Sequence, residues 1–155
     1  MSSAILPGSY DPVTLGHLDI IRRAAERYDE VYAVIFRNPE KTYAFSLEDR
    51  VRMLMLATDD LDNVLVSYSD GLVIDYMREH GIDRIVRGIR SEDDLVYERI
   101  GAEWNLRHGG YETEYLQADP ALAGISSTLA REKIRKGEDL TGILPENVIF
   151  YLRRP

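Results

Sequence analysis

The stretch Val31-Tyr-Ala-Val-Ile-Phe36 decides the fold of this 155-residue chain. It is continuously apolar and rich in β-branched and aromatic side chains, which is typical of a strand buried on both faces of a sheet. Four further short runs, at 3–6, 64–67, 83–86 and 113–117, have the length of strands. A sheet that is buried on both faces needs helices on both faces, so the segments between these runs are expected to form helices.

Those segments are longer and amphipathic, and their spacing predicts a helix between each pair of strands. The predicted helices span 17–28, 46–59, 71–80, 91–107, 126–136 and 145–153. Strand–helix alternation favours parallel strands joined by right-handed crossovers. With no repeat, linker or charge block, we expect one Rossmann-like α/β domain over residues 1–155, with a five-stranded parallel sheet and helices on both faces.

Local signals predict where several helices begin and end. Ser46 and Asp70 are suitable N-caps, and Gly81 is a suitable stop. Met55 follows Leu54 on the apolar side of the helix predicted at 46–59 and is expected to face the core.

Composition excludes several classes of protein. The chain has no cysteine, so it has neither a disulfide scaffold nor a thiol nucleophile. A net charge of -8 argues against a nucleic-acid partner. No apolar run approaches the roughly 20 residues that span a bilayer, and the N-terminus does not resemble a signal peptide. We therefore expect no membrane association and a cytoplasmic location.

Open parallel sheets bind ligands at the carboxyl ends of their strands, which directs attention to the loops after residues 6, 36, 67, 86 and 117. These loops contain no P-loop, no G-x-G-x-x-G and no nucleophile elbow, and the three histidines are too scattered for an obvious metal cluster. Any ligand site must therefore be built in another way.

The loop after the first predicted strand carries the strongest candidates. Ser9 offers a hydroxyl, and Gly16-His17 opens a helix, where free N–H groups and the helix dipole favour an anion. The histidine can point an N–H at the same anion. The structural alternative is a Pro/Gly turn with a solvent-exposed histidine.

Cationic side chains follow two other predicted strands. Lys41 lies past the second strand, where a solvated lysine is the simpler interpretation. Arg87 and Arg90 flank a glycine after the fourth strand, and arginine presents a planar fork suited to phosphate. The alternative for the arginines is a pair of surface salt bridges with acidic residues 92–94.

Ser126, Ser127 and Thr128 open the helix predicted at 126–136, where small hydroxyls either cap the helix or cradle a phosphate. Trp104 is expected in the core or an interface, and His108 on the surface. Taken together, the candidates form a cationic, hydrogen-bonding cluster without a nucleophile or an acid–base pair of carboxylates. This composition fits a polyphosphate substrate that undergoes direct in-line transfer.

The same loops resemble a known family. Thr14-Leu-Gly-His17 is similar to the signature of the nucleotidyltransferase superfamily, and its companion motifs resemble those of the bacterial phosphopantetheine adenylyltransferases from end to end. The motifs are Pro7-Gly-Ser-Tyr-Asp-Pro12, Pro39-Glu-Lys41, Phe45-Ser-Leu-Glu-Asp-Arg-Val51, Arg87-Gly-Ile-Arg90 with Asp94 and Tyr97-Glu98, Ile125-Ser-Ser-Thr128, and Leu144-Pro-Glu-Asn-Val148.

The resemblance implies reversible transfer of the adenylyl group from ATP to 4′-phosphopantetheine, giving dephospho-coenzyme A and pyrophosphate. It implies catalytic roles for His17, Lys41 and Arg90. Ser9, Lys41 and Arg87 would hold the acceptor phosphate, and Val73 would line the path of the pantetheine arm. The residues implied to contact ATP are Ser9, Tyr10, His17, Gly88, Ile89, Arg90, Glu98, Leu122, Ala123, Gly124, Ile125, Ser126, Ser127 and Thr128.

The resemblance also implies magnesium as the companion of ATP and a homohexamer. The chain departs from the family pattern by having Ser9 in place of threonine, Thr128 in place of serine, and no aromatic residue in segment 119–124. Two alternatives stay open. One is the same chemistry on another acceptor, such as nicotinate mononucleotide or a phospho-alcohol with CTP, and the other is a non-catalytic ATP sensor.

Overall fold

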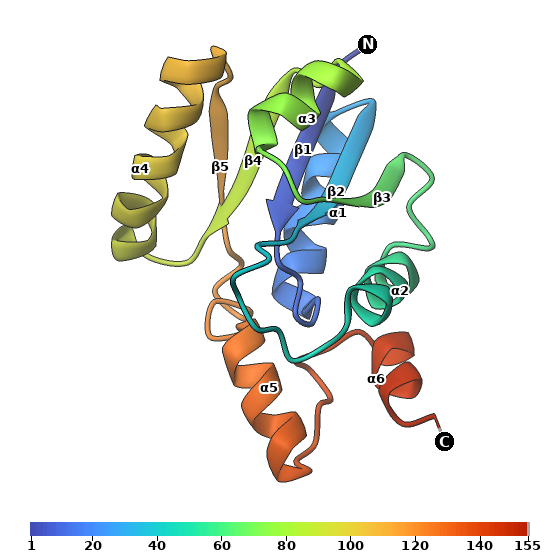
Figure 1. Cartoon of the computed structure of the whole chain (residues 1–155). Coiled ribbons are helices and arrows are strands. Elements are labelled where there is room, and N and C mark those ends of the chain that lie inside the picture. The colour runs from blue at the N-terminus through green and yellow to red at the C-terminus, as the bar shows by residue number, and fades with distance from the viewer. Residues whose placement is uncertain (155) are drawn as a thin grey trace.

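All five predicted strands form and pair in parallel in one sheet (Figure 1). The computed structural model describes residues 1–154. The strands are β1 (Ser3–Gly8), β2 (Glu30–Phe36), β3 (Val64–Ser69), β4 (Arg84–Ile89) and β5 (Thr113–Gln117). Their order across the sheet is β3-β2-β1-β4-β5, so the predicted fold class is confirmed.

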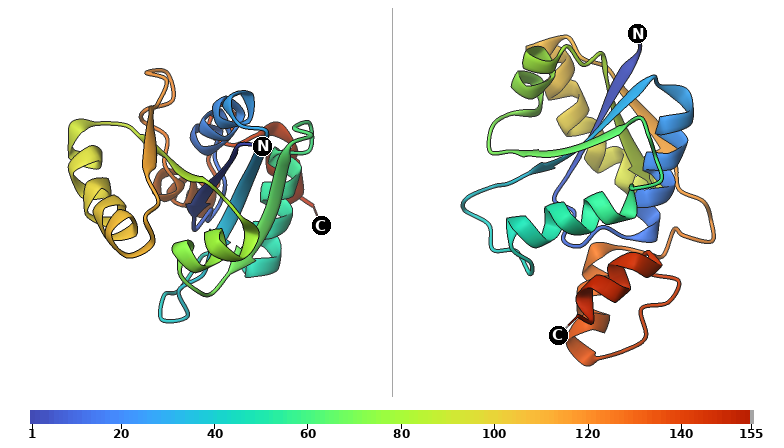
Figure 2. Two further views of the ribbon diagram at one scale, coloured as in Figure 1. Left: turned by 90° about the horizontal axis from the view of Figure 1, so that it is seen from above. Right: turned by 90° about the vertical axis from the view of Figure 1, so that its right-hand side faces the viewer.

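Six helices occur in the described part of the chain, one at each predicted place. They are α1 (Leu15–Arg27), α2 (Leu47–Ala57), α3 (Val73–His80), α4 (Glu92–Gly109), α5 (Ser127–Lys136) and α6 (Glu146–Leu152). Two views agree that α5 and α6 lie beyond the carboxyl ends of the strands (Figures 1 and 2). Within residues 1–154, none of the helices combines the length and the apolar character that crossing a membrane would require.

The core has two parts, one on each face of the sheet. On β1, Ala4 and Leu6 pack into the cluster that includes residues of α1 and α2, while the intervening Ile5 packs into the cluster that includes residues of α3. Successive side chains of a strand point to opposite faces, so this alternation shows that helices cover both faces.

The carboxyl ends of β1 and β4 diverge. β1 pairs with β2 over six residues, from Ser3 to Gly8, but it pairs with β4 only at Ala4 and Ile5. The strand order reverses here, because β1 has its crossover partner β2 on one side and β4 on the other. A crevice at this reversal is where open α/β sheets bind ligands.

Local capping chemistry was predicted correctly at Ser46 and Gly81 but not at Asp70. Ser46 accepts a hydrogen bond from the N–H of residue 49, and Gly81 ends α3 with a φ of 66°. The N-cap of α3 is Leu72, without a side-chain bond. The Asp70 carboxylate instead pairs with Arg37, whose Nε and Nη2 lie 2.8 and 2.7 Å from its two oxygens. The bidentate partner lies 33 residues away, and it outcompetes the local cap.

The prediction for Met55 was wrong. Leu54 is buried in the core, whereas 54% of Met55 is exposed. The periodicity of α2 gives the centre of its buried face correctly, but the packed neighbours determine how wide that face is.

Candidate functional site

A cavity of about 550 Å³ lies at the divergent carboxyl ends of β1 and β4. Its walls come from the loop after β1, the first turn of α1, the end of β4, the start of α4 and the N-terminus of α5. Of the predicted site residues, it is lined by Ser9, Tyr10, His17, Arg87, Gly88, Arg90, Glu98, Leu122, Ile125, Ser126, Ser127 and Thr128. The loops after β1, β4 and β5, three distant parts of the chain, therefore converge, as the sequence predicted.

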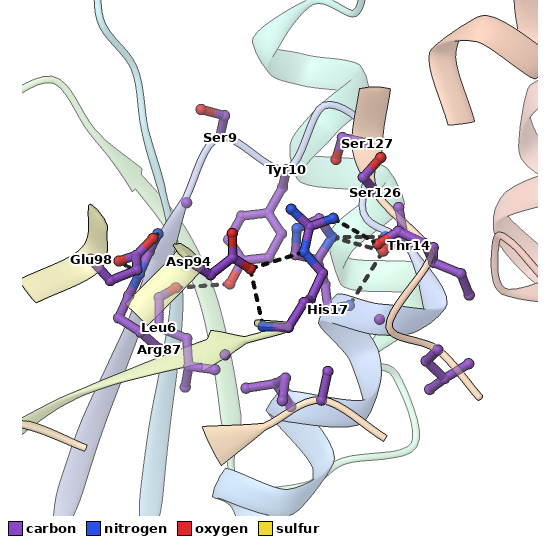
Figure 3. A pocket seen from close by; sticks show the side chains of 18 of the residues that line it. Leu6, Ser9, Tyr10, Thr14, His17, Arg87, Asp94, Glu98, Ser126 and Ser127 are labelled. Atoms are coloured by element: carbon purple, nitrogen blue, oxygen red, sulfur yellow. Dashed lines mark hydrogen bonds and ion pairs between the residues drawn. The ribbon is translucent and has the colours of Figure 1, made fainter. Parts of the chain in front are cut away.

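The loop after β1 has an unusual backbone at Tyr10, whose φ is 47°. A positive φ is uncommon for a residue other than glycine and is concentrated at functional sites. The Tyr10 hydroxyl donates a hydrogen bond to the Leu6 carbonyl at 2.9 Å, and its ring lies 5.0 Å from the ring of His17. Tyr10 is thus a buried wall against which the histidine rests (Figure 3).

His17 is the third residue of α1 and forms a reciprocal cap with Thr14. The Thr14 hydroxyl accepts from the His17 N–H at 3.3 Å, and the Thr14 N–H donates to Nδ1 of His17 at 3.0 Å. Because Nδ1 acts as an acceptor, the neutral ring carries its proton on Nε2. Burial, followed by the charges of Arg87 and Arg90, lowers the pKa of His17 to about 4. The imidazole is therefore a neutral N–H donor at physiological pH.

Both arginines at the end of β4 are already engaged by α4. Nε and Nη2 of Arg87 each donate to Glu98 at 2.9 Å, and Nη1 donates to the Pro7 carbonyl. Nε of Arg90 lies 3.2 Å from Asp94, and its Nη1 donates to Ile125 at 3.3 Å. Figure 3 shows Arg87 and Glu98 on one side of Tyr10.

These ion pairs correct the prediction of a cationic cluster. The charged residues that line the cavity are two arginines and two carboxylates, so their charges balance. The same helix that follows the arginines in sequence supplies the carboxylates. What remains for an anion is a set of N–H donors: the unused guanidinium protons, the imidazole of His17, and the N-termini of α1 and α5.

At the start of α5 the structure shows one of the two roles that the sequence suggested for the hydroxyls, the helix cap. Ser126 is the N-cap and accepts from the Leu129 N–H at 3.0 Å, and Ser127 donates to the Pro12 carbonyl at 2.8 Å. Thr128 accepts from Arg131 at 3.2 Å. Because all three hydroxyl residues also line the cavity, the capped N-terminus of α5 faces it.

Besides Val73, four predicted site residues do not line the larger cavity. Lys41 is exposed in the turn after β2, Ile89 is buried in the sheet, and Ala123 and Gly124 lie in the loop before α5 without reaching it.

A second, smaller cavity of about 350 Å³ adjoins the first. The two share Pro7, Gly8, Ser9, Arg87 and Glu98 as a common wall. Val73 lines the smaller cavity, with Phe36 and Asn105, and its contact with a pantetheine arm stays a prediction. Thr113 also lines it, and within residues 1–154 the buried Thr113 hydroxyl has no hydrogen-bond partner.

Three residues that support the site were not predicted from the sequence. The buried Asp11 carboxylate accepts from the N–H groups of Ala44 and Phe45 at 2.8 and 2.9 Å. Arg131 donates to the Asp11 carbonyl at 2.8 Å. Arg50, on α2, donates to the Ser9 carbonyl at 3.1 Å. The spacing of Arg131 from Thr128, one helical turn, was an available signal.

Trp104 is 43% exposed and stacks on His108, with ring centroids 4.1 Å apart, so it lies outside the core. His108 is on the surface, as predicted. No group of three His, Cys, Asp or Glu residues that could hold a metal occurs among residues 1–154.

The divergent parallel strands, the helix N-termini and the neutral histidine define a Rossmann-like protein whose cavity suits a phosphorylated ligand. The model of the Cytidylyltransferase-like family matches residues 5–133. The chain therefore belongs to the Cytidylyltransferase-like family, and this membership supports nucleotidyl transfer as its class of activity.

Proposed function

We propose that the protein transfers the adenylyl group of ATP to 4′-phosphopantetheine. An oxygen of the acceptor's 4′-phosphate forms a bond to the α-phosphorus of ATP. The bond from that phosphorus to the bridging oxygen of the β-phosphate breaks, and pyrophosphate leaves with the electron pair. Dephospho-coenzyme A is the other product. The motifs after β1, β2 and β4 support this choice of reaction within the family.

The observation that carries the proposal is the wall shared by the two cavities. A two-substrate transfer needs two sites that meet where the bond forms. The smaller cavity offers the apolar side chains of Phe36 and Val73 and the amide of Asn105, which suit an acceptor arm of alkyl and amide groups. The larger cavity has His17 and the N-terminus of α5, which suit a nucleotide with its phosphates.

The chemistry requires that two anions approach each other, and the chain supplies donors rather than a nucleophile. Nε2–H of His17 and the free protons of Arg90 would stabilise the charge that develops on the α-phosphate. Ser9 and Arg87, in the shared wall, would hold the acceptor phosphate. Lys41 would join them from the turn after β2. No covalent intermediate is needed, because the acceptor phosphate is already an anion at neutral pH.

We propose that magnesium enters with ATP as part of the substrate. The carboxylates of the larger cavity, Asp94 and Glu98, are both paired with arginines. The described residues therefore do not suit a resident metal site. Triphosphate oxygens and water are the ligands that magnesium prefers in such cases.

A pyrophosphate-release assay with ATP, magnesium and 4′-phosphopantetheine tests the function. We expect release that depends on all three. Release with nicotinate mononucleotide, or with CTP and a phospho-alcohol, but not with 4′-phosphopantetheine would assign another acceptor. Binding of ATP without release in any mixture would indicate a sensor.

We also propose that the protein is a homo-oligomer, with a hexamer expected from the family resemblance. Helix α4 has 18 residues and none of them is buried. Val96, Tyr97, Ile100 and Trp104 form an exposed apolar stripe along one side of it. Contiguous apolar surface of this kind is typical of an interface, and a second copy of the chain would cover it.

A further inference from the structure

Arg50, on the first turns of α2, is almost completely buried, with 2% of the residue exposed. Its Nε donates to the Phe45 carbonyl at 3.2 Å and its Nη1 to the Ser9 carbonyl at 3.1 Å. Its guanidinium carbon lies 4.0 Å from the centroid of the Tyr43 ring. In the described part of the chain, no carboxylate forms an ion pair with this guanidinium.

Burying a charged group without a carboxylate is unfavourable unless other groups compensate for it. Here two carbonyls and an aromatic face do so. This arrangement links the segments that supply the compensating groups. If one of these segments moved, the guanidinium would be exposed to solvent or would lose a hydrogen-bond partner. Those segments are the loop after β1 and residues 43–45, which precede α2.

The connection continues from Tyr43 to Lys41. The Tyr43 hydroxyl accepts a hydrogen bond from the Asn38 N–H at 2.9 Å. The Lys41 N–H in turn donates to the Asn38 carbonyl at 3.0 Å. An unbroken chain of contacts therefore runs from the Ser9 carbonyl, through Arg50 and Tyr43, to the turn that carries Lys41.

We propose that Arg50 and Tyr43 are positioning residues that set the Lys41 turn relative to Ser9. The turn is otherwise exposed, and a cation on a free loop binds an anion less well than one whose backbone is already placed. Neither Arg50 nor Tyr43 lines either cavity, so both act through the turn. The catalytic consequence rests on the proposed function, in which Ser9 and Lys41 hold the same phosphate.

Limited proteolysis with a lysine-specific endopeptidase tests the positioning directly. The chain has three lysines, Lys41, Lys133 and Lys136, so a 1–41 fragment reports the turn alone. Tyr43→Phe keeps the ring over Arg50 and removes only the bond to Asn38. We expect this substitution to speed formation of the fragment about fivefold, because the cleavage rate follows the fraction of molecules in which the Lys41 turn is open.

Arg50→Met should speed the same cleavage further, and cleavage at the two lysines of α5 serves as an internal measure of global unfolding. Arg52→Met is the matched control, since Arg52 lies on the same helix, is exposed, and pairs only with Glu48 among the described residues. An unchanged rate at Lys41 in Tyr43→Phe, or equal acceleration at all three lysines, would overturn the proposal.

Kinetics distinguish positioning from a general effect on folding. Tyr43→Phe should raise the KM for 4′-phosphopantetheine about fivefold in the wild-type background. It should leave the KM unchanged in Lys41→Ala, because Tyr43 acts through Lys41 and the effects of two substitutions in one series of contacts are not additive. An equal rise in both backgrounds would overturn the proposal. If the wild-type chain released no pyrophosphate, the proposed function would fail, and the proteolysis would still decide the positioning.

Discussion

The backbone N–H of Thr14 donates to Nδ1 of His17 over 3.0 Å, and this single bond determines which ring nitrogen carries the proton. It forces the neutral imidazole to keep its hydrogen on Nε2. The same bond completes the cap of α1. One side chain thus closes a helix end and presents a neutral donor at the cavity.

His17→Ala should lower turnover by about 10²–10³-fold, as removal of a single donor to a developing oxyanion does. The lost cap should reduce the free energy of unfolding by only about 1 kcal/mol. Turnover near the wild-type value in His17→Ala would remove the histidine from the mechanism. Steady-state kinetics and urea unfolding on the same preparations measure both effects.

The pH dependence of stability reports the environment of the same ring. The pKa of His17 lies at about 4 in the folded protein against 6.5 for a free histidine, so between these values the unfolded chain binds more protons. His17 therefore makes stability fall as the pH is lowered from 6.5 to 4 and has no such effect above 6.5. We expect the urea concentration at the midpoint of unfolding to drop less between pH 6.5 and 4 in His17→Asn than in wild type. Parallel curves for the two proteins would contradict the lowered pKa.

The sheet could be predicted from the sequence because β1, β2 and β3 contain short apolar runs with clear boundaries and because helices alternate with strands along the chain. Helix ends that depend on local chemistry, such as Ser46 and Gly81, were also predictable. Asp70 shows where this reasoning stops. Its carboxylate could cap α3, but a guanidinium from the loop after β2 binds it, and only the folded chain brings that partner near.

The position of the cavity could be predicted from the sequence, but its electrostatics could not. Topology places loops at the carboxyl ends of strands, so Ser9, His17 and Arg87 converge as expected. The spacing of Glu98 from Arg87 does not reveal that the two pair across the cavity wall. The burial of Arg50 could not be predicted from the sequence, because a charged residue on an amphipathic helix is ordinarily solvated. The carbonyls that compensate its charge come from other segments.

Arg87→Lys tests whether the guanidinium fork, rather than its charge, matters. Arg87 donates to Glu98 through two nitrogens and to Pro7 through a third, and lysine cannot reproduce that geometry. We expect the KM for 4′-phosphopantetheine to rise by about tenfold, a loss of roughly one charge-assisted hydrogen bond. Arg84→Lys, at the amino end of the same strand, is the matched control. Equal KM values for Arg87→Lys and wild type would show that charge alone suffices.

Ile100→Glu tests the proposed association through α4. The side chain is exposed at the middle of the apolar stripe, and a buried unpaired carboxylate at an interface is strongly unfavourable. We expect size-exclusion chromatography with light scattering to show an oligomer for wild type and a smaller species for the variant. Leu106→Glu changes an exposed leucine on another side of the same helix and should leave the mass unchanged. A monomeric wild type would contradict the proposal.

Gly88→Ala tests why a glycine lies at the end of β4. A Cβ built there would lie 2.8 Å from Cγ1 of Ile20 on α1, closer than packed carbons approach. Because Ile20 is itself buried, the helix or its side chain must shift, which should lower the free energy of unfolding by about 1–3 kcal/mol. Ile20→Ala should remove the clash, so the double variant should lose less stability than the sum of the two single variants. Gly124→Ala is the control, because a Cβ there meets nothing within 4 Å. Full additivity in urea unfolding, or a Gly88→Ala variant as stable as Gly124→Ala, would show that the close approach to α1 is not the reason for the glycine.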